Sequence, residues 1–219
     1  GDLQFFEYNG SATLANLDLS NTGAGADAHL GIQFRGVGLQ NGTGVLPMGA
    51  ISLTDVDISG LYVRQMIGLQ RYTTAGIALN DVRLGGVGSA IMGGFGAALR
   101  IDAVGGGTFA SSTTIDLNDT YFRGVGGLGL DIEIAPDGFG FLRADATDTR
   151  WDTTLSTAQT PDNLTLAEQY QVENRILHFV DGTHPNPLFG TFDGFVETVD
   201  GNAYTTTTQN GNIQRGVDV

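Results

Sequence analysis

Side chains of opposite charge alternate along one short stretch of the chain, at Arg143, Asp145, Asp148, Arg150 and Asp152. Two carboxylates can act as general acid and base on a glycosidic bond, and guanidinium groups can hold an acidic sugar through paired hydrogen bonds. The same alternation on an exposed strand usually forms surface ion pairs of little energetic worth. A polysaccharide-modifying site, with Asp145, Asp148, Arg143 and Arg150 as its residues, is therefore the alternative to a surface ion-pair network.

A second group of carboxylates could bind calcium, which takes six to eight oxygen ligands. It consists of Asp131, Glu133 and Asp137, and the pair Asp55 and Asp57 is a further candidate. The chain contains neither an EF-hand nor a calcium-binding nonapeptide repeat. Solvated carboxylates on an outward face are the competing interpretation.

Histidine and aromatic residues offer weaker candidates. His29, His178 and His184 are too scattered for a zinc signature, and a helix dipole is sufficient to explain His178. Trp151, Tyr121 and Phe122 could form a platform for sugar rings. Phe122 and Trp151 occupy inward positions of the repeat described next, which favours core packing.

A repeated pattern must position all of these side chains. Apolar residues alternate in Ile51–Gly60, Ile77–Gly86 and Ile115–Gly124, with fainter copies at Leu14–Asn21 and Ala144–Trp151. In each copy the alternation slips by one residue after a small polar residue, and Asn and Asp tolerate the left-handed conformation best among non-glycine residues. We therefore predict two short strands joined by a one-residue corner in every copy. The corner residues are Asn16, Asp55, Asp81, Asp119 and Asp148.

The copies recur at the intervals of roughly 20 to 50 residues that are typical of solenoid proteins. Third strands are predicted within 29–34, 62–67, 97–104 and 128–134, and glycine-rich loops connect them. Two strands, a corner, a third strand and a variable loop describe one coil of a right-handed parallel β-helix. The predicted class is therefore all-β, with the β-helix over residues 1–160.

The sequence changes character after residue 160. Thr165 and Glu168 form a capping box that predicts a helix through about Val180, ended by Gly182. Asp200–Gly201 between two alternating segments predicts a β-hairpin. Residues 161–219 are thus expected to form a capping helix and a hairpin that lead toward a following module.

Composition restricts the classes of partner. The net charge is −14 and the pI about 4.2, and all ten basic residues are arginines. This acidity argues against binding to nucleic acid or anionic membranes, which require a basic surface. There is no cysteine, and no run of about 18 apolar residues predicts membrane insertion. An acidic chain without lysine or cysteine suits an extracellular environment.

The coil pattern resembles the right-handed parallel β-helix domains of large bacterial surface and secreted proteins. The tail, with its segments 164–170, 203–206 and 213–218, looks like the junction between two such β-helices. The resemblance implies a module of an extracellular or cell-surface protein and carries over no catalytic residue. It also implies neighbouring coils, because an uncovered first coil exposes backbone and apolar side chains.

The sequence therefore predicts a non-catalytic structural or adhesive module that stacks end to end on neighbouring copies or modules. The alternatives are a polysaccharide lyase, hydrolase or epimerase, and a glycan-binding β-helix. Calcium is the one cofactor for which a ligand set is suggested, and glycans are the expected small-molecule partners.

Overall fold

The computed structural model describes residues 3–6, 10–22, 30–35, 50–70, 76–92, 96–102, 113–117, 119–124, 126–127, 130–135, 140–183 and 191–198. Strands dominate these residues and form two sheets, of six and eleven strands. The six-stranded sheet consists, in spatial order, of β1 (Leu3–Phe6), β3 (Leu30–Arg35), β5 (Gln65–Gln70), β8 (Ala97–Asp102), β12 (Leu130–Ala135) and β15 (Ile176–Leu177).

The eleven-stranded sheet contains the copies of the sequence repeat. Its strands are β2 (Ala12–Asn21), β4 (Ile51–Tyr62), β6 (Ile77–Gly85), β7 (Ala90–Ile91), β9 (Thr113–Asp116), β10 (Tyr121–Arg123), β11 (Gly126–Gly127), β13 (Gly140–Asp145), β14 (Arg150–Trp151), β16 (Phe179–Thr183) and β17 (Thr191–Glu197). Only β16 and β17 pair antiparallel among these strands.

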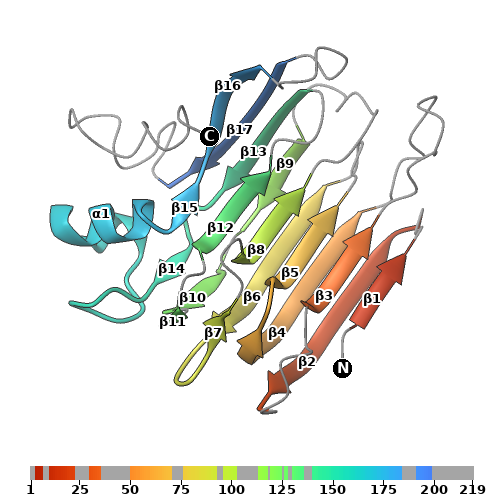
Figure 1. Ribbon diagram of the computed structural model, residues 1–219, viewed down its shortest axis with the longest axis horizontal. Coiled ribbons are helices and arrows are strands. Elements are labelled where there is room, and N and C mark those ends of the chain that lie inside the picture. The colour runs from red at the N-terminus through yellow and green to blue at the C-terminus, as the bar shows by residue number, and fades with distance from the viewer. Residues whose placement is uncertain are drawn as a thin grey trace.

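The chain alternates between the two sheets from β1 to β6, and each strand pairs in parallel with the next strand of its own sheet (Figure 1). The pairing places equivalent residues of the repeat side by side, with Leu53 opposite Leu79 and Ile58 opposite Leu84. β1 and β2 lie at one end of the molecule, and β16 and β17 lie at the other (Figure 1). Both sheets continue beyond residue 160, because β15 pairs with β12 and β17 pairs with β13.

The corner prediction is confirmed at four of five positions. Asn16, Asp55, Asp81 and Asp119 have φ values of 55°, 52°, 51° and 54°. In β2, β4 and β6 the corner lies inside one continuous strand, whereas at Asp119 it separates β9 from β10. A left-handed residue reverses the alternation, and in β2, β4 and β6 the strand pairing resumes in register directly after it. Apolar residues on both sides of the corner therefore face the core.

Asp148 is the exception, because its φ is not positive. It lies in a turn in which the Thr149 amide donates to the Ala146 carbonyl at 3.1 Å. Oδ1 of Asp145 accepts hydrogen bonds from the amide and hydroxyl of Thr147, at 3.1 and 2.7 Å. These local hydrogen bonds hold the turn without a left-handed residue at position 148.

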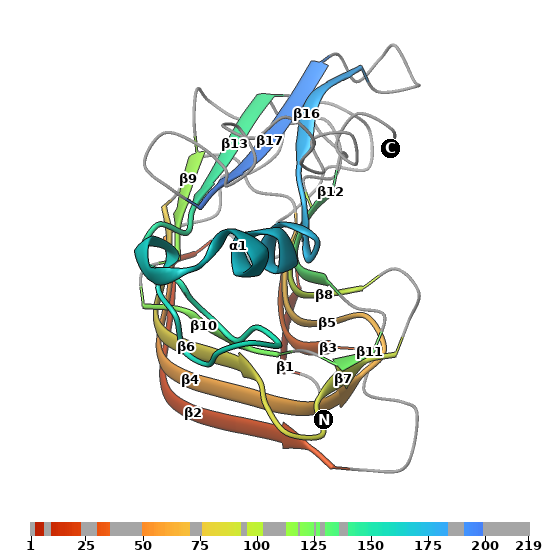
Figure 2. The same cartoon turned by 90° about the vertical axis from the view of Figure 1, so that its left-hand side faces the viewer.

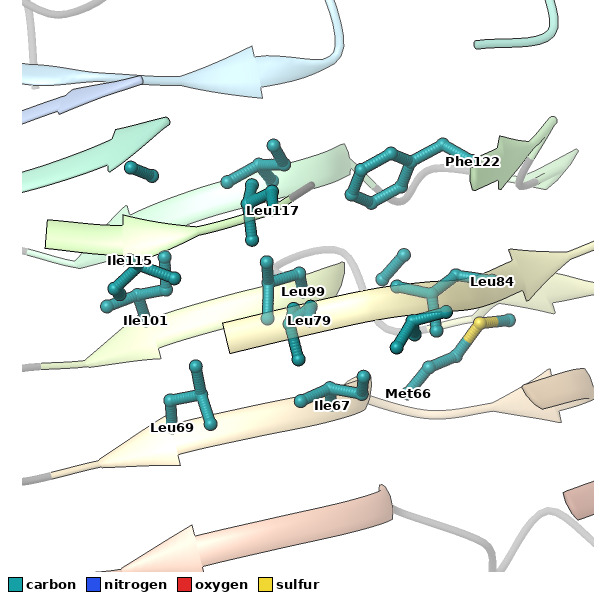
Figure 3. Packing of buried hydrophobic residues seen from close by; sticks show 14 of the residues in the cluster. Met66, Ile67, Leu69, Leu79, Leu84, Leu99, Ile101, Ile115, Leu117 and Phe122 are labelled. Atoms are coloured by element: carbon teal, nitrogen blue, oxygen red, sulfur yellow. The ribbon is translucent and has the colours of Figure 1, made fainter. Parts of the chain in front are cut away.

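Apolar side chains from both sheets fill the space between them and form one cluster (Figure 3). The inward positions predicted from the alternation are fully buried, as at Leu53, Val56 and Ile58. Thr120 and Thr149 occupy the same interior column as Val56 and Val82. Their hydroxyls donate to the carbonyls of Leu79 and Leu117, at 3.3 and 3.1 Å. Each buried hydroxyl is thereby satisfied by a carbonyl of the preceding copy of the repeat.

The helix prediction is correct at its start and wrong at its end. α1 (Leu166–Glu173) follows the short 3-10 helix η1 (Pro161–Asn163), and Thr165 and Glu168 form the expected capping box. The helix ends at Glu173 and does not continue to Val180, because Ile176 and Leu177 pair with Ile132 and Glu133 of β12. Gly182 lies in β16 and not at a helix end.

Two further details of the C-terminal prediction differ. Leu166, an apolar residue within the predicted helix, is 51% exposed. The buried helical residues are Glu168, Val172 and Glu173. The predicted hairpin strand at 202–206 lies outside the described residues, and the antiparallel partner of β17 is β16. Figure 2 shows α1 beside the last strands of the two sheets.

Candidate functional site

The structure does not bring the alternating charged residues 143–152 together into one site. Asp145 is engaged by Thr147 within its own turn, and Asp148 is exposed. β13 places Asp145 beside Asp116 and Glu197, whereas Arg150 and Asp152 lie beyond the turn. The side chain of Arg143 lies outside the described residues. The two candidate carboxylates therefore lie on different elements, Asp145 on β13 and Asp148 in the turn that follows it.

Arg150 and Asp152 both contact Tyr121, an outward residue that the sequence had suggested for a sugar platform. The Tyr121 hydroxyl donates to Oδ1 of Asp152 at 2.6 Å, and the Arg150 guanidinium lies 5.3 Å from the centre of the Tyr121 ring. Burial, with the hydrogen bond to Asp152, raises the pKa of Tyr121 to about 12. A phenol with this pKa stays protonated at neutral pH, so it acts here as a hydrogen-bond donor.

Phe122 and Trp151, the other members of that suggested platform, belong to the core. Both are fully buried, and their rings stack with centroids 4.7 Å apart and planes 10° apart. The interpretation of these two residues as core packing is confirmed. Trp151 Nε1 is buried and has no hydrogen-bond partner among the described residues.

Ion pairs cross the strands on the outward face of the repeat. Arg83 contacts Asp55 at 3.2 Å and Asp81 at 2.5 Å, and Arg123 binds both carboxylate oxygens of Asp57. These side chains are partly exposed, so each pair contributes little stability alone. Asp55 and Asp57, the candidate calcium pair, thus both form ion pairs with arginines.

The other calcium candidates also have arginine partners. Asp131 is fully buried and accepts a hydrogen bond from Arg175 at 2.6 Å, while Glu133 lies 3.6 Å from Arg100. Asp137 lies outside the described residues. The described part of the chain contains no group of three or more acidic, histidine or cysteine side chains arranged to hold a metal ion.

Burial sets the protonation of Asp131. Its desolvation raises the pKa to about 6, although the Arg175 guanidinium lowers it and the Asp152 carboxylate adds a smaller increase. One carboxylate oxygen, Oδ2, has no hydrogen-bond partner among the described residues. The buried carboxylate thus depends on Arg175 alone for compensation, and it titrates between mildly acidic and neutral pH.

Arg175 also lines an open pocket of about 400 Å³ that sequence reasoning missed. The other lining residues are Gly124, Asp152, Thr153, Thr154, Gln171 and Asn174. They come from the end of β10, the segment after β14 and the last turn of α1. Residues from such distant parts of the sequence carry no common motif, so no local pattern could have predicted this pocket.

Glu168 connects α1 to the segment after β14. Its Oε1 accepts hydrogen bonds from the hydroxyls of Thr153, at 3.2 Å, and Ser156. Its Oε2 accepts from the amide and hydroxyl of Thr165, at 2.8 and 2.6 Å. The hydrogen bonds, chiefly those from Ser156 and Thr165, lower the pKa of Glu168 to about 2.

A second buried glutamate, Glu173, joins the end of α1 to β17. Its carboxylate lies 2.9 Å from Nε2 of His178 and accepts a hydrogen bond from the Thr198 hydroxyl at 3.2 Å. The Val196 amide donates to Nδ1 of His178 at 3.1 Å, which places the imidazole proton on Nε2. His178 is therefore a structural connector five residues beyond the end of α1, and the helix-dipole interpretation was wrong. His29 and His184 lie outside the described residues.

In the part of the chain that the structure describes, fold and site together define a strand-rich protein with two largely parallel sheets, one α-helix and a polar pocket where the helix meets the strands. Searches of protein-family models, of curated proteins and of solved structures found no match to this chain. Within the described residues no helix has the length and apolar character needed to cross a membrane.

Proposed function

We propose that this chain is a right-handed parallel β-helix that serves as a non-catalytic structural or adhesive module of an extracellular or cell-surface protein. It stacks through the edge formed by β1 and β2 on the coils of a neighbouring module or copy. The acidic composition and the absence of lysine and cysteine support the extracellular assignment.

The strand pairing supports a β-helix. Successive strands alternate between two sheets, and equivalent residues of the repeat pair in register. Crossover connections between parallel strands of one sheet are right-handed in about 98% of cases, which supports the proposed hand.

The observation that carries the stacking proposal is incomplete burial at one end of the core. Leu17 and Leu19 of β2 are only half-buried, whereas their ladder partners Val56 and Ile58 are fully buried. Leu3, Phe5 and Leu14 are likewise only partly buried against the core. Among the described strands, β2 pairs only with β4 and β1 pairs only with β3. One more coil would cover these side chains and complete the backbone hydrogen bonds of the edge.

Light scattering across a concentration series tests this proposal. We expect association, and we expect Leu19→Lys to weaken it by at least tenfold, because the substitution places a charge in the contact. Ser20→Lys, an exposed position on the same strand, is the matched control and should leave association unchanged. A chain that stays monomeric at every concentration, or equal effects of both variants, would contradict stacking through this edge.

Calcium binding at Asp131, Glu133 and Asp137 stays a prediction. Repeating the scattering and thermal unfolding with calcium and with a chelator tests it, and a calcium-dependent rise in melting temperature would support it. The enzyme alternative at Asp145 and Asp148 is tested by a polysaccharide turnover screen of the chain and of Asp145→Asn. No specific contact in the described residues favours turnover over the structural role.

A further inference from the structure

A rigid set of polar side chains surrounds the pocket between α1 and the segment after β14. Oδ1 of Asp152 accepts hydrogen bonds from the Tyr121 hydroxyl, at 2.6 Å, and from the Ala158 amide, at 2.9 Å. Arg175 donates to the Asp131 carboxylate at 2.6 Å and to the Asp152 carbonyl at 2.8 Å. Hydrogen bonds within the protein hold both side chains in place, so a ligand would bind without first ordering them.

Gln171 is oriented in the same way. Its Oε1 accepts hydrogen bonds from the amide and the hydroxyl of Thr154, at 2.8 and 3.0 Å. The amide group is planar, so these two contacts fix the direction of Nε2, which remains a donor.

Both donors and acceptors remain available in the pocket. Within the described residues the hydrogen bonds of the Asp152 side chain all use Oδ1, and nothing engages Oδ2. Arg175 uses two of its five N–H donors. The pocket thus presents a carboxylate acceptor together with guanidinium and amide donors. A ligand group that both donates and accepts, such as a hydroxyl, satisfies this combination best.

The charges and the lining of the pocket argue against anionic, cationic and apolar ligands. The fully buried Asp131 compensates the positive charge of Arg175, and Asp152 adds a negative charge at the wall, so an anion is not attracted. A cation would approach Asp152 only beside the Arg175 guanidinium. Among the described residues the lining contains no large apolar side chain, and a purely apolar ligand would leave the Asp152 carboxylate and the Arg175 guanidinium without hydrogen bonds to it. The volume of about 400 Å³ is within the range of small-molecule sites.

We propose that this pocket binds a neutral saccharide unit, with Asp152 accepting from one ligand hydroxyl and Arg175 and Gln171 donating to others. The site is separate from the edge of β1 and β2, so its test and the stacking test can fail independently. A glycan held here would give an extracellular module a contact with a polysaccharide surface without any turnover.

The test is a titration of the isotope-labelled full chain, followed by the backbone amide signals of Gly124, Thr153 and Thr154. The ligands are glucose, galactose, mannose, N-acetylglucosamine and N-acetylgalactosamine, with sodium sulfate and propylammonium chloride as the anion and cation probes. We expect at least one sugar to shift these signals saturably, and neither ion to do so.

Two variants with matched controls locate the contact. Asp152→Asn keeps the Oδ1 acceptor for Tyr121 and Ala158 and replaces only the free acceptor by a donor. Gln171→Ala removes the amide donor. Each of these two substitutions should raise the Kd for the sugar on the order of tenfold. Asp148→Asn, an exposed carboxylate, and Gln169→Ala, a helical glutamine that donates to the Leu164 carbonyl, should leave the Kd unchanged.

Thermal unfolding of each variant checks that the fold is retained. The proposal is overturned if no sugar in the panel shifts these signals, if sulfate or propylammonium shifts them instead, or if the pocket variants bind as tightly as their controls.

Discussion

The backbone conformation of single residues decides where the repeat can reverse its alternation. Asp119 is exposed, has a φ of 54° and makes no hydrogen bond to its side chain among the described residues, so its backbone dominates its contribution. A β-branched residue is strained in the left-handed region, by about 1–3 kcal/mol. We therefore expect Asp119→Val to lower the free energy of unfolding by this amount, and Asp119→Gly to leave it unchanged or raise it slightly.

Asp148 provides the control for this prediction. It occupies the equivalent place in the next copy and is also exposed, but its φ is not positive. Asp148→Val should change the free energy of unfolding by less than about 0.5 kcal/mol. Denaturant unfolding measures all three variants. If Asp119→Val and Asp148→Val lower the free energy of unfolding by the same amount, the left-handed conformation at Asp119 is not the cause of the loss.

Protonation of Asp131 should make the protein more stable in mild acid. Its folded-state pKa of about 6 exceeds the ordinary value of 3.8, because the carboxylate is fully buried. The folded state therefore binds a proton more tightly, and this stabilisation is lost as the pH rises through about 6. Between pH 4.5 and 7 the loss amounts to about 2 kcal/mol.

Asp131→Asn removes this titration while Arg175 and Asp152, the charged groups that face it, remain. We expect the variant to lack the Asp131 contribution when denaturant unfolding is measured at pH 4.5 and at pH 7. Asp148→Asn should keep the dependence of the parent chain. If the free energy of unfolding of Asp131→Asn depends on pH in the same way as that of the parent chain, another group is responsible for the dependence.

Sequence reasoning at the residue scale succeeded where the signal was local. The corners follow from a slip in the alternation next to Asn or Asp, and Phe122 and Trp151 follow from their inward positions. The Asp131–Arg175 pair joins residues 44 positions apart, and its burial depends on how the strands stack. No spacing rule connects two such residues, so the sequence suggested either a calcium ligand or a solvated carboxylate at Asp131.

At the scale of elements, Glu168 helps to fix the position of α1. The hydrogen bonds to Glu168 come from both the N-cap of α1 and the segment 153–156. Its lowered pKa, about 2 against the usual 4.5, means that the folded state favours the ionised form. This contribution to stability is present above pH 4.5 and is lost as the pH falls toward 2.

Glu168→Gln should therefore loosen α1 without unfolding the sheets. We expect amide exchange in the helix to rise on the order of tenfold at neutral pH, with little change in β4 and β6. Asp162→Asn, an exposed acidic residue in the preceding turn, is the control. Equal acceleration in the strands and the helix would show that Glu168 stabilises the whole protein and not one element.

The extent of α1 shows why element boundaries were harder to predict than element types. The capping box is a local signal and was read correctly. The end of the helix is set by pairing of Ile176 and Leu177 with β12, a tertiary contact. Strand pairing in this case outweighs helix propensity, which is a weak preference for each residue.

For the whole molecule, the cost of removing an apolar side chain should reveal whether the edge at β2 is covered. Leu19 and Ile58 are ladder partners with the same role in successive copies, but only Ile58 is fully buried. Ile58→Ala should cost about 2–5 kcal/mol at any protein concentration. Leu19→Ala should cost about 1 kcal/mol in the dilute monomer, because a half-buried side chain loses less on truncation.

The two costs should converge when a neighbouring coil covers β2. At concentrations where the chain associates, burial of Leu19 approaches that of Ile58, so Leu19→Ala should then cost roughly as much. Denaturant unfolding at low and high protein concentration measures this difference. A cost for Leu19→Ala that stays at about 1 kcal/mol in the associated state would place the contact elsewhere on the surface, and the open end of the core would then need another explanation.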